Sequence, residues 1–154
     1  MNESFPDFWP EVDVVFDLAW SISKTALSIT SAILQSDIVL VPICSESKAV
    51  RSGLNTINEV SRFNPNIVVI ATKLGASRNH DGDIRHISDT VHHYVGKNIP
   101  VLPLKQSTAF DAIFEQQKSI RALMQGYPLL AHHYRQVSAQ FDAIYSLIDQ
   151  NHAE

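Results

Sequence analysis

The sequence of 154 residues is poor in cysteine, in glycine and in long apolar runs. Its one cysteine, Cys44, cannot form an internal disulfide, which is typical of a protein from a reducing compartment. No segment approaches the ~20 apolar residues that a membrane-spanning helix needs. The acidic start MNESFPDFWPEVD also lacks the basic region of a signal peptide. These absences predict a soluble, cytoplasmic protein.

The five glycines are too scattered to form a phosphate-binding loop. They occupy positions 53, 75, 82, 96 and 126, and none belongs to G-x-x-x-x-G-K-[ST] or G-x-G-x-x-G. Glycine is what lets a backbone turn its N–H groups inward around phosphate oxygens. The nearest candidate is Ser21–Thr25 (SISKT), which we interpret as a capped helix start. We therefore expect that the isolated chain neither binds ATP tightly nor hydrolyses it.

The composition is that of an ordinary globular protein, with 45% hydrophobic and 18% charged residues. A chain of this length buries roughly two-thirds of its unfolded surface, which is enough to fold without disulfides or a structural metal. We expect a single domain over residues 1–154, with a core at 12–125 and a C-terminal helix at 129–150. The formal charge of −4 gives no general attraction to nucleic acid.

Short apolar runs alternate with helical patterns along the chain. The predicted strands are Val12–Leu18, Asp37–Ile43, Ile67–Ala71 and Ile99–Leu104. The predicted helices are Ser23–Gln35, Ser47–Phe63, Asp83–Val95, Thr108–Met124 and Leu129–Ile148. This order predicts an α/β fold, with a Rossmann-like parallel sheet of about four strands, helices on both faces and a helical C-terminus.

Ligands of parallel sheets bind at the carboxyl ends of the strands. Asp17 lies at the end of the first predicted strand, where it is either a functional carboxylate or a capping group of the fold. Cys44 also lies at a strand end, and we interpret it as an inert buried thiol. The four predicted ends are Asp17–Ser21, Pro42–Glu46, Thr72–Gly75 and Pro103–Ser107.

Four stretches within residues 12–125 carry a resemblance to a known family. They read VDVVFDLAWS, SDIVLVPICSESKAVRSGLNTINEV, IVVIATKL and IPVLPLKQSTAFDAIFEQQKSIRAL. In this order and spacing they resemble the ParA/MinD family of deviant-Walker P-loop ATPases, which position DNA, plasmids and division proteins. The resemblance implies half of a P-loop NTPase fold, with ATP and Mg²⁺ as ligands. It also implies a nucleotide-switched dimer that acts in plasmid or chromosome segregation.

The resemblance also implies roles for individual residues. Asp17 matches the carboxylate that helps hold magnesium and the attacking water. Thr72 and Lys73 match the pair that contacts the nucleotide base, with Thr72 in place of the family's usual asparagine. Pro103 and Leu104 match the segment that flanks the base.

The family's first strand and its lysine-bearing phosphate loop have no counterpart in this sequence. We therefore expect either a fragment or a short relative that is inactive alone. The alternative function is a catalytically inactive scaffold of the same fold that binds a protein partner. A flavodoxin-like or response-regulator-like domain fits less well, because its first strand would need an acidic cluster. Self-association is expected through an unpaired sheet edge, and a partition adaptor protein is a further candidate partner.

Two groups of polar side chains also have simple interpretations. Lys105, Lys118, Arg121 and Arg135 are candidates for the nonspecific DNA contact that the family makes, although scattered cations on an acidic chain are more often plain surface. His86 and His93 fall seven residues apart on one predicted helix. Neither H-x₃-H nor C-x₂-C spacing accompanies them, so we expect no zinc site.

Overall fold

The chain folds around a three-stranded parallel sheet. The computed structural model describes residues 13–18, 27–74, 80–96 and 98–152. Within these ranges the strands Val39–Ile43 (β1), Ile67–Leu74 (β2) and Val101–Lys105 (β3) lie in the order β1-β2-β3. The described helices are Leu27–Gln35 (α1), Ser47–Val60 (α2), His80–Val95 (α3), Ala109–Gln116 (α4), Ile120–Gly126 (α5) and Pro128–His152 (α6). The predicted α/β class with a parallel sheet is confirmed.

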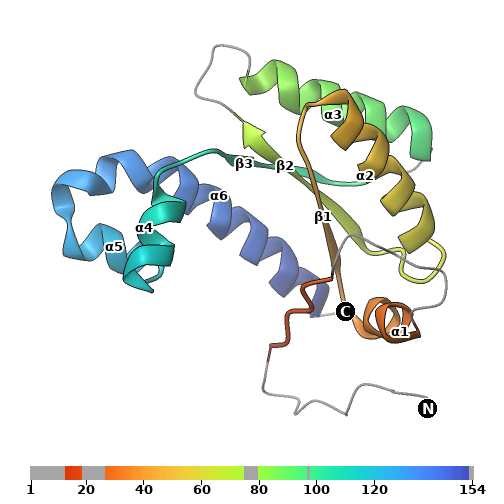
Figure 1. The fold of residues 1–154 in the computed structure, drawn as a ribbon, viewed down its shortest axis with the longest axis horizontal. Helices are drawn as coiled ribbons and strands as arrows, with labels where there is room; N and C mark the ends of the chain where they lie inside the picture. The colour runs from red at the N-terminus through yellow and green to blue at the C-terminus, as the bar shows by residue number, and fades with distance from the viewer. Residues whose placement is uncertain (1–12, 19–26, 75–79, 97, 153–154) are drawn as a thin grey trace.

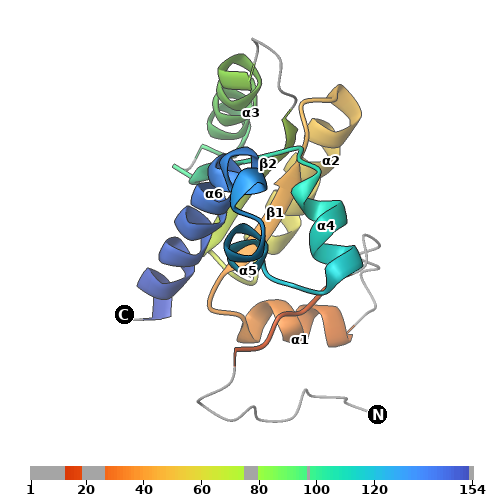
Figure 2. The same ribbon diagram turned by 90° about the vertical axis from the view of Figure 1, so that its left-hand side faces the viewer.

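Helices cover both faces of the sheet, as predicted. Figure 1 shows α2 and α3 together on one side and the long α6 on the other, with α4 and α5 below the start of α6 at the left of the view. Figure 2 shows α1 below the start of β1. Each β-to-β connection therefore crosses over through a helix, which is how parallel strands are joined.

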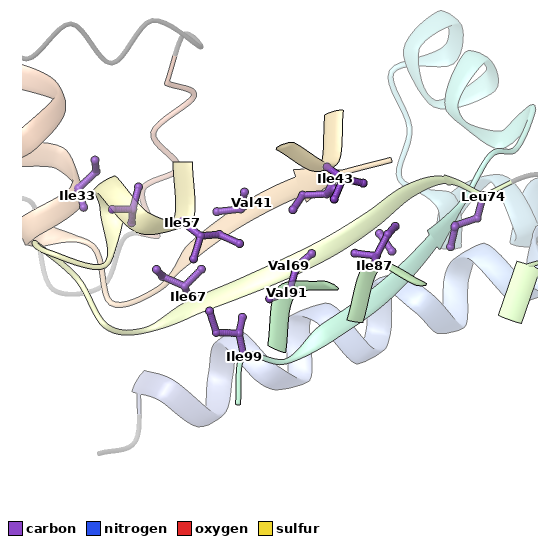
Figure 3. Packing of buried hydrophobic residues seen from close by; sticks show 13 residues of the cluster. Ile33, Val41, Ile43, Ile57, Ile67, Val69, Leu74, Ile87, Val91 and Ile99 are labelled. Carbon is purple, nitrogen blue, oxygen red and sulfur yellow. The ribbon is translucent and has the colours of Figure 1, made fainter. Parts of the chain in front are cut away.

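The larger core lies between the sheet and the pair α2 and α3. Val69 of the central strand is fully buried there, together with Ile57 of α2 and Ile87 of α3. Figure 3 shows these side chains converging from the three elements. Alternate residues of a strand face opposite sides, so Val68 and Ile70 form a second, smaller cluster with Ile144 of α6. The apolar runs are continuous because the central strand is buried on both faces.

Gly53 allows α2 to approach β1 closely. A Cβ atom at this position would lie 2.4 Å from Cδ1 of Ile43, closer than two carbon atoms can approach without a shift. Ile43 is only 1% exposed, so its side chain fills the space that the glycine leaves. This helix is therefore packed against the sheet through its backbone at one turn.

The prediction of a first strand is wrong over the residues that the structure describes. Asp13–Leu18, the described part of the predicted strand Val12–Leu18, lies outside the sheet and has no regular secondary structure. Val15 in this segment is 91% exposed, although its β-branched side chain favoured a buried strand. The described residues therefore contain three strands, where about four were predicted.

The single helix predicted over Thr108–Met124 is also wrong. Gln117 adopts a left-handed conformation with φ of 50° and ends α4. The hydroxyl of Ser119 then accepts a hydrogen bond from the N–H of Ala122 at 3.2 Å and caps α5. The chain turns here so that α5 packs beside α6, and Leu123 becomes buried with Val137.

Among the residues that the structure describes, no helix is both long enough and apolar enough to cross a bilayer.

Candidate functional site

The carboxyl ends of β2 and β3 bring together most of the predicted site residues. Ala71 pairs with Pro103, and Leu74 pairs with Lys105. Between these two pairs, β2 has two residues and β3 has one, so Thr72 and Lys73 lie opposite Leu104. The residues assigned by resemblance to the base contact therefore lie on two adjacent strands. Strand register produces this arrangement across about thirty positions of sequence.

The extra residue makes a bulge with a strained backbone. Lys73 has φ of 53°, in the left-handed region that side chains other than glycine rarely adopt. Its side chain is exposed, while that of Thr72 is partly buried. Bulges are frequent next to functional sites because they redirect a side chain. Here the bulge turns the lysine out of the alternation that the strand would otherwise give it.

The end of β1 leads into α2 at the same edge of the sheet. Cys44 is a free thiol immediately after the strand, and it is only partly buried where a buried thiol was predicted. Glu46 occupies the N-cap position of α2, but its side chain makes no capping hydrogen bond. Its carbonyl oxygen instead accepts from the N–H of Val50 at 2.9 Å. The carboxylate of Glu46 is exposed beside the start of this helix.

The end of β3 is held by polar contacts to the long C-terminal helix. The backbone N–H of Lys105 donates to Oε1 of Gln140, and its Nζ donates to Oε1 of Gln136, each at 3.0 Å. Beyond the strand, Oγ of Ser107 accepts from the N–H of Ala109 at 3.1 Å. These bonds fix the direction in which the chain leaves the sheet toward α4.

Asp17 does not lie at the end of a strand, where it was predicted. It belongs to the segment 13–18, which lies outside the sheet, and its side chain is exposed. The segment Ser21–Thr25, considered above as a phosphate-loop lookalike, lies outside the described residues. A position for magnesium can therefore not be built from Asp17 and the strand ends that surround Thr72.

Metal-ligating side chains do not gather in the described part of the chain. No group of three or more His, Cys, Asp or Glu side chains is close enough there to hold a metal ion. His92 on α3 instead contacts the carbonyl oxygen of Ile99 through Nε2 at 3.1 Å, and since a carbonyl only accepts, Nε2 is the donor. This histidine ties the end of α3 to the start of the next strand.

The four candidate cations for DNA do not all remain available. Arg121 of α5 pairs with Asp142 of α6 at 2.6 Å, and the Lys105 ammonium contacts Gln136. Lys118 and Arg135 are exposed. A surface ion pair contributes little to stability, but it lowers the net charge that a phosphate would meet.

Comparisons with family models, with curated proteins and with solved structures found no match for this chain.

The polar anchors on α6 are contacts that the sequence analysis missed. Gln136 and Gln140 lie one helical turn apart, so both side chains lie on the same face of the helix. Two glutamines four residues apart on a predicted helix are a signal for such a face. The signal is weak, since glutamine is common on solvated helix surfaces.

Proposed function

We propose that this chain acts in DNA partition or positioning, as a ParA-like protein that contributes the base-contacting side of a nucleotide site. The observation that carries the proposal is the bulge that sets Thr72 and Lys73 opposite Leu104, beside Pro103. Parallel α/β sheets bind their ligands at this end of the strands. The same four residues carry the base-contact roles that the sequence resemblance implies. Their proximity therefore supports the resemblance from which the role is taken.

The chemistry available at the bulge suits a heterocyclic base better than a phosphate. The Leu104 and Pro103 side chains are partly buried apolar groups, against which a flat ring can stack. Thr72 adds a hydroxyl that both donates and accepts, and Lys73 adds a cation. No glycine-rich cradle is present in the sequence to hold the phosphates. Binding by this chain alone is therefore expected to be weak and to depend on the base.

Amide NMR with millimolar adenosine, and separately with Mg-ATP, tests this proposal. We expect shifts confined to Thr72, Lys73 and Leu104, with similar affinities for both ligands because the phosphates add few contacts. Guanosine is the control ligand. Thr72→Val, which keeps the shape of the side chain but removes its hydroxyl, should weaken the adenosine response several-fold. Shifts elsewhere in the chain, or none at all, would refute a base site here.

Cellular function requires a separate measurement. With its neighbouring reading frames on a low-copy plasmid, the wild-type chain should support retention of the plasmid without selection. Lys73→Ala should reduce that retention if the bulge belongs to a nucleotide switch. A K-G-G-x-x-K-[ST] loop encoded upstream or in an adjacent frame would favour the switch further.

A second candidate function, a catalytically inactive scaffold that binds a protein partner, is favoured by two exposed residues on one face of β1. Leu40 is 39% exposed and Pro42 is also exposed, because α6 lies over β2 and β3 instead. In a plasmid-retention assay, this candidate predicts full activity for Lys73→Ala and reduced activity for Leu40→Asp. The two proposed functions therefore give opposite results for Lys73→Ala.

A further inference from the structure

The outer edge of β3 can be assigned residue by residue from the hydrogen bonds of the sheet. The N–H of Val69 donates to the carbonyl oxygen of Pro100 at 2.9 Å, so Pro100 faces β2. Successive residues of a strand direct their backbone groups to opposite sides, so Leu102 and Leu104 also face β2. The N–H of Gln106 donates to the carbonyl oxygen of Leu74 at 3.0 Å, which agrees with this alternation.

The outward positions of β3 are therefore Val101, Pro103 and Lys105. Pro103 has no backbone N–H to offer a neighbouring strand. The outward N–H of Lys105 is occupied, since it donates to Oε1 of Gln140 at 3.0 Å. Only Val101, at the first position of the strand, keeps an outward donor that no other described group takes.

Gln140, which accepts the hydrogen bond from the N–H of Lys105, is held in place by the packing of α6. Ile144 of α6 is 8% exposed and packs on Val68 and Ile70 of the central strand. One turn before Gln140, Gln136 accepts from the ammonium of Lys105, which lies at the same edge. The helix is thereby fixed with one amide oxygen aimed at the strand backbone.

We propose that α6 seals the outer edge of β3, with Gln140 and Pro103 acting together to prevent another strand from adding to the sheet. Edge strands present unpaired N–H and C=O groups that recruit strands from other chains, and folded proteins use proline or covering elements to prevent this. At Lys105 the side-chain amide of Gln140 takes the place of an incoming strand. At position 103 proline removes the backbone donor. Association with a second copy or a partner then proceeds through other surfaces. This assignment does not depend on the proposed nucleotide role.

Amide hydrogen exchange measured by NMR tests the first part of the seal. The N–H of Lys105 should be protected in the wild-type chain, and Gln140→Leu should accelerate its exchange at least tenfold. Gln140→Glu keeps an acceptor oxygen and should retain most of the protection. Gln136→Leu is the matched control, because it removes the contact to the Lys105 side chain and leaves the backbone bond in place. Exchange at Lys105 that is fast in the wild type, or unchanged in Gln140→Leu, would overturn the assignment.

The second part concerns association through the opened edge. In Pro103→Val combined with Gln140→Leu, all three outward amides become available. The molar mass from light scattering should then rise with concentration above that of the wild-type chain, with a gain in thioflavin fluorescence. Each single substitution should give a smaller rise. A double variant that is folded by circular dichroism and matches the wild-type mass at every concentration would contradict the seal. Should the double variant not fold, the exchange of Lys105 in the folded single variants decides.

Discussion

Replacement of Asn64 is expected to destabilise the fold more than any surface change near it. Asn64 is 5% exposed and follows α2, where it joins two segments that are distant in sequence. Its Nδ2 donates to the carbonyl oxygens of Ile33 at 3.0 Å and Ser36 at 2.6 Å. Its Oδ1 accepts from the N–H of Asn66 at 2.8 Å. One side chain therefore satisfies the end of α1 and the turn before β2.

The magnitude follows from the three backbone groups that Asn64→Ala leaves without this partner. A lost hydrogen bond costs about 0.5 to 1.5 kcal/mol net, and more where water cannot replace it. Ser36 is partly buried, so water can reach some of the site and the lower values apply there. We expect a total of about 3 kcal/mol. For a domain of this size that corresponds to a melting temperature lower by roughly 6 to 12 °C.

Thermal unfolding followed by circular dichroism, with urea titration for the free energy of unfolding, measures this loss. Asn66→Ala is the matched control, since its Nδ2 makes one exposed bond, to the carbonyl oxygen of Asp37 at 3.1 Å. It should change stability by less than about 0.5 kcal/mol. Asn64→Asp keeps the acceptor for Asn66 but sets a carboxylate against two carbonyl oxygens, so it should be at least as harmful as alanine. A melting temperature for Asn64→Ala within about 2 °C of the wild type would refute the reasoning.

Three further substitutions test other features of the structure by the same unfolding measurements. Lys73→Gly should stabilise the chain by about 1 kcal/mol, because glycine adopts a positive φ without the steric cost that a side chain bears; a loss of stability would mean that the bulge does not form in solution. Gly53→Ala should destabilise by about 1 to 3 kcal/mol, despite the higher helix propensity of alanine, because the new methyl group overlaps Ile43. Asp17→Asn should stay within about 0.5 kcal/mol of the wild type, since its side chain is exposed. A shift of several degrees in that variant would place the Asp17 carboxylate in the hydrogen bonding of the fold.

Strands could be predicted where burial on both faces marks the sequence. Ile67–Ala71 is a continuous apolar run because β2 is the central strand, and the prediction was confirmed over that range. Its last three residues, Thr72 to Leu74, were not predicted as strand, because a bulge interrupts the apolar run with a threonine and a lysine. Periodicity cannot detect an extra residue whose effect is to break the period.

The error at Asp13–Leu18 has a different cause. Its sequence has the same apolar, β-branched character as the true strands, so no local rule separates it from them. A segment joins a sheet only if an edge strand offers it free backbone groups, and which strand lies at the edge is decided by the assembled sheet. Val39 donates to the carbonyl oxygen of Asn66 at 2.8 Å and therefore faces β2, which leaves Leu40 and Pro42 as the outward residues of β1. Since proline lacks a donor, a strand on that side would gain fewer hydrogen bonds than the local pattern assumes.

The candidate site was predictable in its location and not in its detail. Topology alone assigns ligands to the carboxyl ends of parallel strands, and that rule selected Thr72 and Pro103. Thr72 and Lys73 lie opposite Leu104 because of a bulge. The backbone N–H of Lys105 is bound by Gln140, which is 35 residues away in sequence. The contact of Lys105 is set by the packing of α6, which no local pattern encodes.

Asn64 shows how a correct local prediction can hide a nonlocal role. The helix predicted over Ser47–Phe63 stops before the pair Asn64-Pro65, and α2 does end before it, at Val60. Proline accounts for the stop through its effect on the preceding residue, and any small polar residue would satisfy that rule. The buried amide is needed for another reason, because Ile33 and Ser36 lie 31 and 28 residues upstream and direct two carbonyl oxygens to one point. A side chain with two donors and an acceptor satisfies these groups and Asn66 together, so the amide of Asn64 serves both the tertiary contact and the turn.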